Sequence, residues 1–225
     1  KAFSIADVIA ALSVVVAAAT FIAGVNAWRR EFIGKRRIEL AENVLALFYE
    51  AQDAFREIRN PFSFVGEGST RKRDEYEPEE ETAILNRAYV VIERYQKREK
   101  LFAELRSNRY RFMAAFGPKS GEPFDELNKI RNEVLLSAHI LGTYYWKRQG
   151  RVEMSDDEFK KHLAEMNKYE AVFWFMGEED DEISQRVQSA VEKIEEIVKK
   201  ESFIKKSWFI KRKKSFQIHK PRLTS

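Results

Sequence analysis

The sequence predicts an all-α protein in which an N-terminal transmembrane helix continues into a cytoplasmic antiparallel helical bundle. The first observation behind this prediction is an uncharged apolar run from Val8 to Val25. The second is that apolar residues after this run recur at three- and four-residue spacing, without strand-like alternation. The third is composition, because 9 Gly and 5 Pro among 225 residues provide few turns and favour long helices.

The apolar run is long enough to cross a bilayer when its flanks are included. Roughly 20 apolar residues in a helix span the hydrocarbon core, so residues 1–28 are predicted to be a transmembrane anchor. A cleaved signal peptide and a helix buried in a soluble core are the alternatives. The run is longer than the apolar core of a signal peptide, which usually has about 7–15 residues. In addition, the main basic cluster follows the run instead of preceding it.

Charge predicts the orientation of this anchor. Positively charged flanks stay in the cytoplasm, so the body is expected to be cytoplasmic, with the N-terminus outside, at the cell inner membrane. Trp28 lies where an interfacial aromatic residue is expected. Only two charged residues precede the run, Lys1 and Asp7, whereas the basic cluster after it consists of Arg29, Arg30, Lys35, Arg36 and Arg37.

The first helix is predicted to continue beyond the membrane. Residues 31–59 carry an amphipathic stripe and no proline, and Asn60-Pro61 ends the helix. Residues 60–77 are expected to form a long, exposed and mobile connection. Pro78, which three acids follow, begins a second helix that is expected to extend to Phe116.

The remaining helices follow from apolar spacing and from start and stop residues. A third helix is expected over residues 123–150, and a fourth over residues 155–176, where the first residues have capping-box spacing. A fifth helix is expected over residues 183–201. Together these helices predict one bundle over residues 29–201, followed by a basic and aromatic tail over residues 202–225.

Small residues recur along one face of the apolar run. Their spacing alternates between four and three residues, which lets helices approach closely with the left-handed crossing of a coiled coil. We therefore expect a homo-oligomer. A pore is one alternative, because two hydroxyl residues lie on this face, and an ordinary alanine-rich anchor is the other. The expected self-association residues are Ala6, Ala10, Ser13, Ala17, Thr20, Gly24 and Ala27.

The C-terminal tail concentrates positive charge. Residues 203–225 hold eight Lys or Arg and no acid, although the whole chain has a net charge of only +4. Each basic residue gains about 1 kcal/mol near an anionic leaflet, and aromatic rings insert at the headgroup level. Nucleic-acid binding and a disordered solubilising tail are the alternatives. The expected membrane-surface residues are Trp28, Arg29, Arg30, Lys35, Arg36, Arg37, Lys205, Lys206, Trp208, Phe209, Lys211, Arg212, Lys213 and Lys214.

No catalytic, cofactor-binding or metal-binding residue is predicted. The absence of cysteine excludes disulfides, thiolate nucleophiles and cysteine-type zinc sites. His139, His162 and His219 belong to no repeated Glu-x-x-His motif, so a bundle di-metal site is not expected. The sequence also contains no Walker-type phosphate loop, no Gly-x-Ser-x-Gly and no paired-glycine fingerprint. The chain is therefore not expected to be an enzyme.

These features predict a single-pass, membrane-anchored helical scaffold that self-associates and engages a protein partner or the anionic leaflet. One alternative is a membrane-perturbing, pore-forming effector, and another is a membrane-tethered nucleic-acid binder. The layout resembles that of many small bacterial inner-membrane proteins, some of which are membrane-acting effectors of phage defence. This resemblance concerns architecture only and covers no specific motif.

Overall fold

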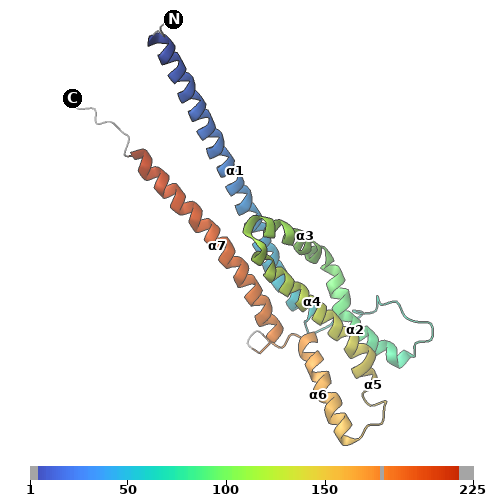
Figure 1. Ribbon diagram of the computed structural model, residues 1–225. Helices are drawn as coiled ribbons and strands as arrows, with labels where there is room; N and C mark the ends of the chain where they lie inside the picture. The colour runs from blue at the N-terminus through green and yellow to red at the C-terminus, as the bar shows by residue number, and fades with distance from the viewer. Residues whose placement is uncertain (1–4, 178–179, 218–225) are drawn as a thin grey trace.

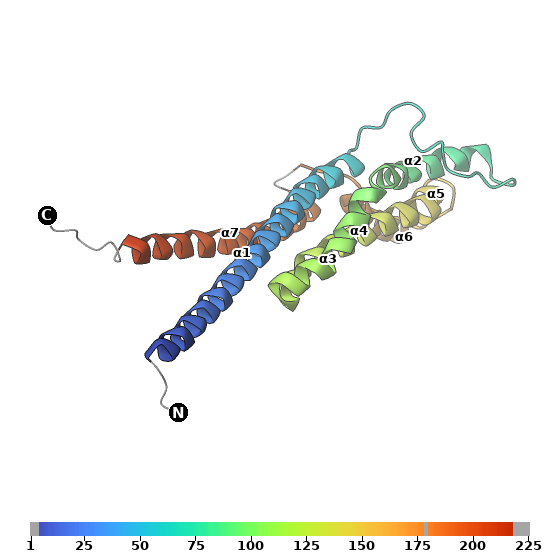
Figure 2. The same ribbon diagram turned by 90° about the horizontal axis from the view of Figure 1, so that it is seen from above.

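The structure is a computed structural model that describes residues 5–177 and 180–217, and its regular elements are all helices (Figure 1). The longest, α1 (Ile5–Ile58), is one unbroken helix of 54 residues, or about 80 Å. Its N-terminal part projects alone from the rest of the molecule, and its C-terminal half is the spine of the bundle (Figures 1 and 2). The predicted all-α bundle with a long apolar N-terminal helix is confirmed.

The bundle half of α1 is helical because an apolar stripe gives it one face to bury. The buried residues recur every three or four positions, as an amphipathic helix requires. Aromatic rings connect the stripe to other helices: Phe48 meets Phe124 edge-on with centroids 4.9 Å apart, and Phe55 meets Phe102 at 5.4 Å. The buried stripe consists of Ala41, Val44, Leu47, Phe48, Ala51, Ala54, Phe55 and Ile58.

The predicted second helix is two helices, so that expectation was wrong. The segments are α2 (Glu79–Lys97) and α3 (Glu99–Phe116), which meet at Arg98. The Arg98 backbone lies at φ −107° and ψ 8°, outside the helical range, while its Nε donates to Glu57 of α1 at 2.9 Å. This change of direction carries α3 back along α1, where Phe102 packs against Phe55.

The predicted third helix is also interrupted. A short 3-10 turn, η1 (Pro118–Gly121), leads into α4 (Glu122–Ile140), a π-helical segment η2 (Leu141–Tyr145) and α5 (Trp146–Arg148). Gly142 explains part of the irregularity, because a Cβ on it would lie 2.6 Å from the Cβ of Ala88. The glycine therefore lets this segment approach α2 more closely than any other residue would allow.

The last two helices are α6 (Asp156–Phe173) and α7 (Glu182–Gln217). The predicted capping box is present: Glu158 N–H donates to the Ser155 hydroxyl, and the Glu158 carboxylate accepts from the Ser155 N–H at 2.9 Å. The predicted end of the last helix near residue 201 was wrong, because α7 continues through Gln217. α7 runs antiparallel to α1, and Tyr49 donates to Glu195 across the pair at 2.7 Å.

A buried arginine joins the ends of α1, α6 and α7. Arg59 follows α1 directly, and its side chain is only 1 % exposed. It donates to carbonyl oxygens at the end of α6, at 2.7 Å for Val172 and 2.7 Å for Trp174. It also pairs with Asp181, ahead of α7, at 2.6 Å. Because the last carbonyls of a helix have no partner within it, this guanidinium caps α6 while it fixes the start of α7.

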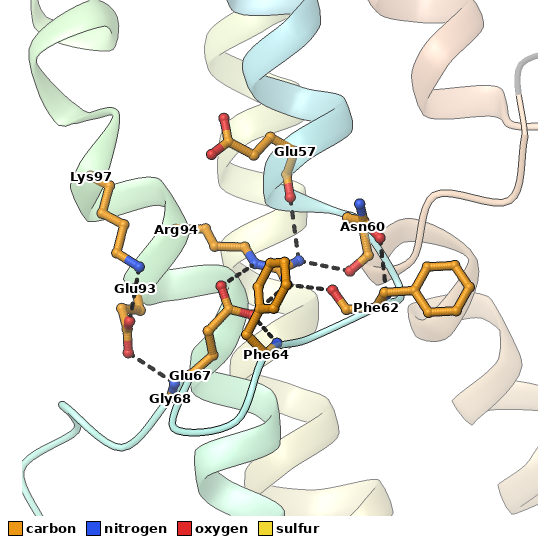
Figure 3. Close-up of polar contacts among 9 residues, drawn as sticks. All are labelled: Glu57, Asn60, Phe62, Phe64, Glu67, Gly68, Glu93, Arg94 and Lys97. Carbon is orange, nitrogen blue, oxygen red and sulfur yellow. Dashed lines mark hydrogen bonds and ion pairs between the residues drawn. The ribbon is translucent and has the colours of Figure 1, made fainter.

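A second buried arginine orders the connection after α1, which was predicted to be mobile (Figure 3). Arg94 of α2 donates to the carbonyl oxygens of Asn60 and Phe62 at 2.7 and 2.6 Å and to Glu57 O at 3.3 Å. It also pairs with Glu67 at 2.6 Å, and this hydrogen bond lowers the pKa of Glu67. The expectation of a mobile loop did not anticipate these contacts.

The rest of this connection is tied to α2 in the same way. The Glu93 carboxylate accepts from Gly68 N–H and from the Thr70 hydroxyl, both at 2.8 Å. Arg71 and Glu77 form an ion pair in which both side chains are at most 15 % exposed, and its hydrogen bonds lower the pKa of Glu77 to about 2. The charged run was expected to lie on the surface; residues 72–76 are exposed there, and Arg71 and Glu77 at its ends are partly buried.

Candidate membrane interface

The apolar part of α1 contacts nothing that would bury it. The most apolar 18-residue window of the helix is 0 % buried, and the helix is long and apolar enough to cross a membrane. In a water-soluble fold such a surface would cost about 25 cal/mol for each Å² left exposed. The segment is therefore not part of the core that the described residues form.

The expected self-association face points to open space. Six of its seven residues are exposed, and Ala27 is half-buried. No atom lies within 4 Å of the place that a Cβ on Gly24 would occupy. The hydroxyls of Ser13 and Thr20 donate to carbonyls one turn back in their own helix, Ser13 to Ile9 at 2.8 Å and Thr20 to Ala17 at 2.9 Å. The face is thus available for packing, and both hydroxyls are satisfied within the helix.

Below the apolar segment, α1 presents a row of aromatic and basic side chains. The Trp28 ring stacks on Phe32, with centroids 5.6 Å apart, and the Arg36 guanidinium lies 4.9 Å from the centre of the Phe32 ring. These three residues are four positions apart and so share one helix face. Trp28 is 67 % exposed, and Phe32 and Ile33 remain more than 40 % exposed. The exposed apolar surface therefore continues past Trp28 to Phe32 and Ile33, within the same turns as the first arginines.

The other predicted cations of this cluster lie around the same turns. Arg29 and Arg30 are exposed, and Lys35 lies 3.9 Å from Glu39, one turn on. Arg37 is half-buried, and its guanidinium is 5.0 Å from the centre of the Phe116 ring of α3. The structure thus brings the end of α3 against the basic cluster.

Arg111 was not predicted, although it belongs to this region. It lies on the exposed side of the last turns of α3 and lines the same groove as Arg36 and Arg37. No local signal in the sequence points to it, because its place depends on how α3 turns after Arg98. The unexpected break at Arg98 hid which face of α3 would meet α1.

α7 brings the basic tail back to the same end of the molecule (Figures 1 and 2). Tyr49 pairs with Glu195 and Gln52 with Gln188. Continuing this register, with the same rise per residue in both helices, places about residues 203–215 level with residues 29–37. Figure 2 shows the two helices diverging sideways as they approach this level.

The tail residues expected at the membrane surface fall on this part of α7. Its backbone is helical, and the side chains of residues 201–217 lie outside what the structure describes. The predicted residues concerned are Lys205, Lys206, Trp208, Phe209, Lys211, Arg212, Lys213 and Lys214.

No family model, curated protein or solved structure matches this chain. Within residues 5–177 and 180–217, no group of three or more His, Asp or Glu is arranged to hold a metal ion.

Proposed function

We propose that this protein is a single-pass, membrane-anchored helical scaffold that self-associates through its span and holds its bundle against an anionic leaflet. The observation that carries the proposal is the fully exposed apolar segment of α1, which ends in an exposed tryptophan and a basic cluster. A bilayer buries such a segment, and basic flanks hold it in the cytoplasmic orientation.

The common level of the two basic segments supports binding to the leaflet. The cluster after the span and the basic part of α7 come from opposite ends of the sequence, yet the antiparallel register brings them to about one height along α1. Since they diverge sideways, they would contact a flat surface at two separate places. Two contacts restrict the tilt of the bundle relative to the membrane more than the span alone would.

The span itself favours a scaffold over a pore. Its small residues are exposed and suit close packing with a second copy. The hydroxyls that could line a channel, Ser13 and Thr20, already donate within the helix. Residues 8–25 contain no acid or base that could serve as an ion pathway.

A surface for a protein partner lies on the ordered connection between α1 and α2, away from the apolar end of α1 (Figure 1). Its side chains Phe62, Phe64, Val65 and Tyr76 are all at least 82 % exposed, and Arg94 holds the backbone at Asn60 and Phe62. Exposed aromatic residues on a fixed backbone are typical of protein-binding surfaces.

The test is extraction of the full chain from membranes with alkaline carbonate. We expect the wild-type chain to remain with the membrane. A double variant with Val15→Lys and Val16→Lys should be released, since a lysine at the centre of a span costs about 3 kcal/mol. The matched control, with Val15→Leu and Val16→Leu, should remain. Release of the wild-type chain would contradict the proposal.

Contact between α7 and the leaflet can be tested separately, because the chain has no cysteine and a single one can be labelled. A fluorophore on Ser207→Cys should be quenched by headgroup-labelled lipid in anionic bilayers and not in neutral ones. The same label on Ser69→Cys, in the distal connection, should remain unquenched in both. Equal quenching at the two positions would contradict the predicted placement of α7.

A further inference from the structure

A groove of 870 Å³ lies between α1 and the C-terminal end of α3, directly below the exposed apolar segment. Phe32 lies on its lining nearest to the apolar segment, and three arginines also line it, Arg36 and Arg37 from α1 and Arg111 from α3. Ala114 lines the α3 side, and its short side chain leaves room for a ligand to approach the arginines.

Two of these arginines are held in place before any ligand arrives. The Arg36 guanidinium lies 4.9 Å from the centre of the Phe32 ring, and that of Arg37 lies 5.0 Å from the centre of the Phe116 ring. Both rings therefore restrict long side chains that would otherwise lose rotamer freedom on binding. Arg36, which is exposed, can still donate in the plane of its guanidinium.

The charge of the groove favours an anion. Its one carboxylate, Glu39, lies 3.9 Å from Lys35, which offsets its charge. The three guanidiniums leave a net positive site. A guanidinium donates two parallel hydrogen bonds to a phosphate, which a lysine ammonium cannot do.

The position of the groove specifies the source of the phosphate. Exposed apolar side chains on α1 continue to Phe32 and Ile33, so the groove begins where the apolar surface ends. Side chains of a helix lean toward its N-terminus, and for Arg36 and Arg37 that direction is toward the apolar segment. These two arginines thus point toward the level of a lipid headgroup, and Arg111 faces the same groove from α3.

We infer that this groove binds the phosphate of a single anionic phospholipid of the leaflet, with the exposed Arg36 and Arg111 as its donors and Arg37 in its lining. This inference rests on the proposed membrane anchoring and adds a specific lipid site to it. One bound lipid would connect α1 and α3 and fix the bundle relative to the bilayer surface.

The test uses the full chain in nanodiscs of phosphatidylcholine with a minor fraction of phosphatidate, extracted into uncharged detergent and weighed by native mass spectrometry. We expect one phosphatidate retained per chain. Arg111→Ala should reduce that retention about tenfold, the usual effect of losing a charged hydrogen bond. Arg106→Ala is the matched control, because Arg106 is an exposed arginine of α3 that lines a different groove, and it should leave retention unchanged.

The outcomes distinguish a failure of the lipid site from a failure of the proposed membrane anchoring. If carbonate releases the wild-type chain from membranes, both fail. If the wild-type chain remains with the membrane but Arg111→Ala and Arg106→Ala retain the same amount of phosphatidate, only the groove site is wrong. The overall positive charge of the chain would then explain the retention. If inorganic phosphate binds the wild-type chain in uncharged detergent as tightly as phosphatidate does, the lipid source is wrong.

Discussion

Replacing Arg59 with methionine should destabilise the bundle far more than any surface arginine change. The Arg59 and Asp181 side chains are each 1 % exposed and lie 2.6 Å apart. In Arg59→Met the carboxylate of Asp181 keeps, among the described residues, the Ile183 N–H at 3.1 Å and the Ser184 hydroxyl at 3.0 Å. The carbonyls at the end of α6 lose their donor at the same time.

The magnitude follows from the burial of the pair. Removing one partner of a fully buried ion pair costs about 3–5 kcal/mol, because the remaining charge is left uncompensated. We expect about 4 kcal/mol for Arg59→Met and less for Asp181→Asn, since the arginine would keep its carbonyl acceptors. The double variant Arg59→Met with Asp181→Leu should cost less than the sum, because it removes both charges.

The assay is urea unfolding of the full chain in uncharged detergent, followed by circular dichroism. The control is Arg56→Met, one turn earlier on α1, where the arginine is 41 % exposed and lies 3.5 Å from Asp53. An exposed pair of this kind contributes at most about 1 kcal/mol. If Arg59→Met lowers the unfolding free energy no more than Arg56→Met does, the buried pair of Arg59 and Asp181 does not stabilise the bundle as proposed.

Three further predictions concern the bundle. The pKa of Glu77 is lowered to about 2 from 4.5, so its contribution to stability is complete above pH 4.5 and is lost as the pH falls toward 2. Urea midpoints of Glu77→Gln should therefore depend less on pH over this interval than those of the wild-type chain, and equal dependence would refute the assignment. Gly142→Ala places a methyl group 2.6 Å from Ala88 and should cost about 1–3 kcal/mol by chemical denaturation, whereas a gain in stability would show that the close approach is absent. Ser155→Ala removes the capping box of α6 and should cost about 1 kcal/mol, with local hydrogen exchange increasing at the start of α6 and not elsewhere.

The fold could be predicted where a local pattern decides the structure. The uninterrupted apolar and amphipathic spacing of α1 predicted one helix to Arg59, and the capping box at Ser155 marked the start of α6. Pro78 likewise marked the start of α2, which begins at the next residue. In each case the residues that decide the element are neighbours in sequence.

The predictions were wrong where contacts between residues far apart in sequence decide the backbone conformation. Apolar spacing runs straight through Arg98, and the break there accompanies an ion pair with Glu57, 41 positions earlier. The order in the connection depends in the same way on Arg94, which reaches 34 positions back to Asn60. A single sequence contains no signal for such pairs.

In the candidate membrane interface, too, the residues that are continuous in sequence could be predicted and those that the fold brings together could not. The apolar segment and the cluster from Trp28 to Arg37 could be predicted because they are continuous in sequence. Arg111 could not, because its place beside Arg36 depends on how α3 turns after Arg98. The end of α7 was also missed, because the regular apolar spacing of the bundle stops near residue 201 while the helix continues into the basic and aromatic tail.

The most direct measurement of the central claim is the depth of individual residues in a bilayer. A spin label on Ala17→Cys, in the apolar segment, should be accessible to oxygen dissolved in lipid and protected from a water-soluble nickel complex. A label on Ala46→Cys, which is exposed on the bundle half of α1, should show the reverse. If Ala17→Cys is as accessible to the nickel complex as Ala46→Cys, the apolar segment does not lie in the membrane and the account is contradicted.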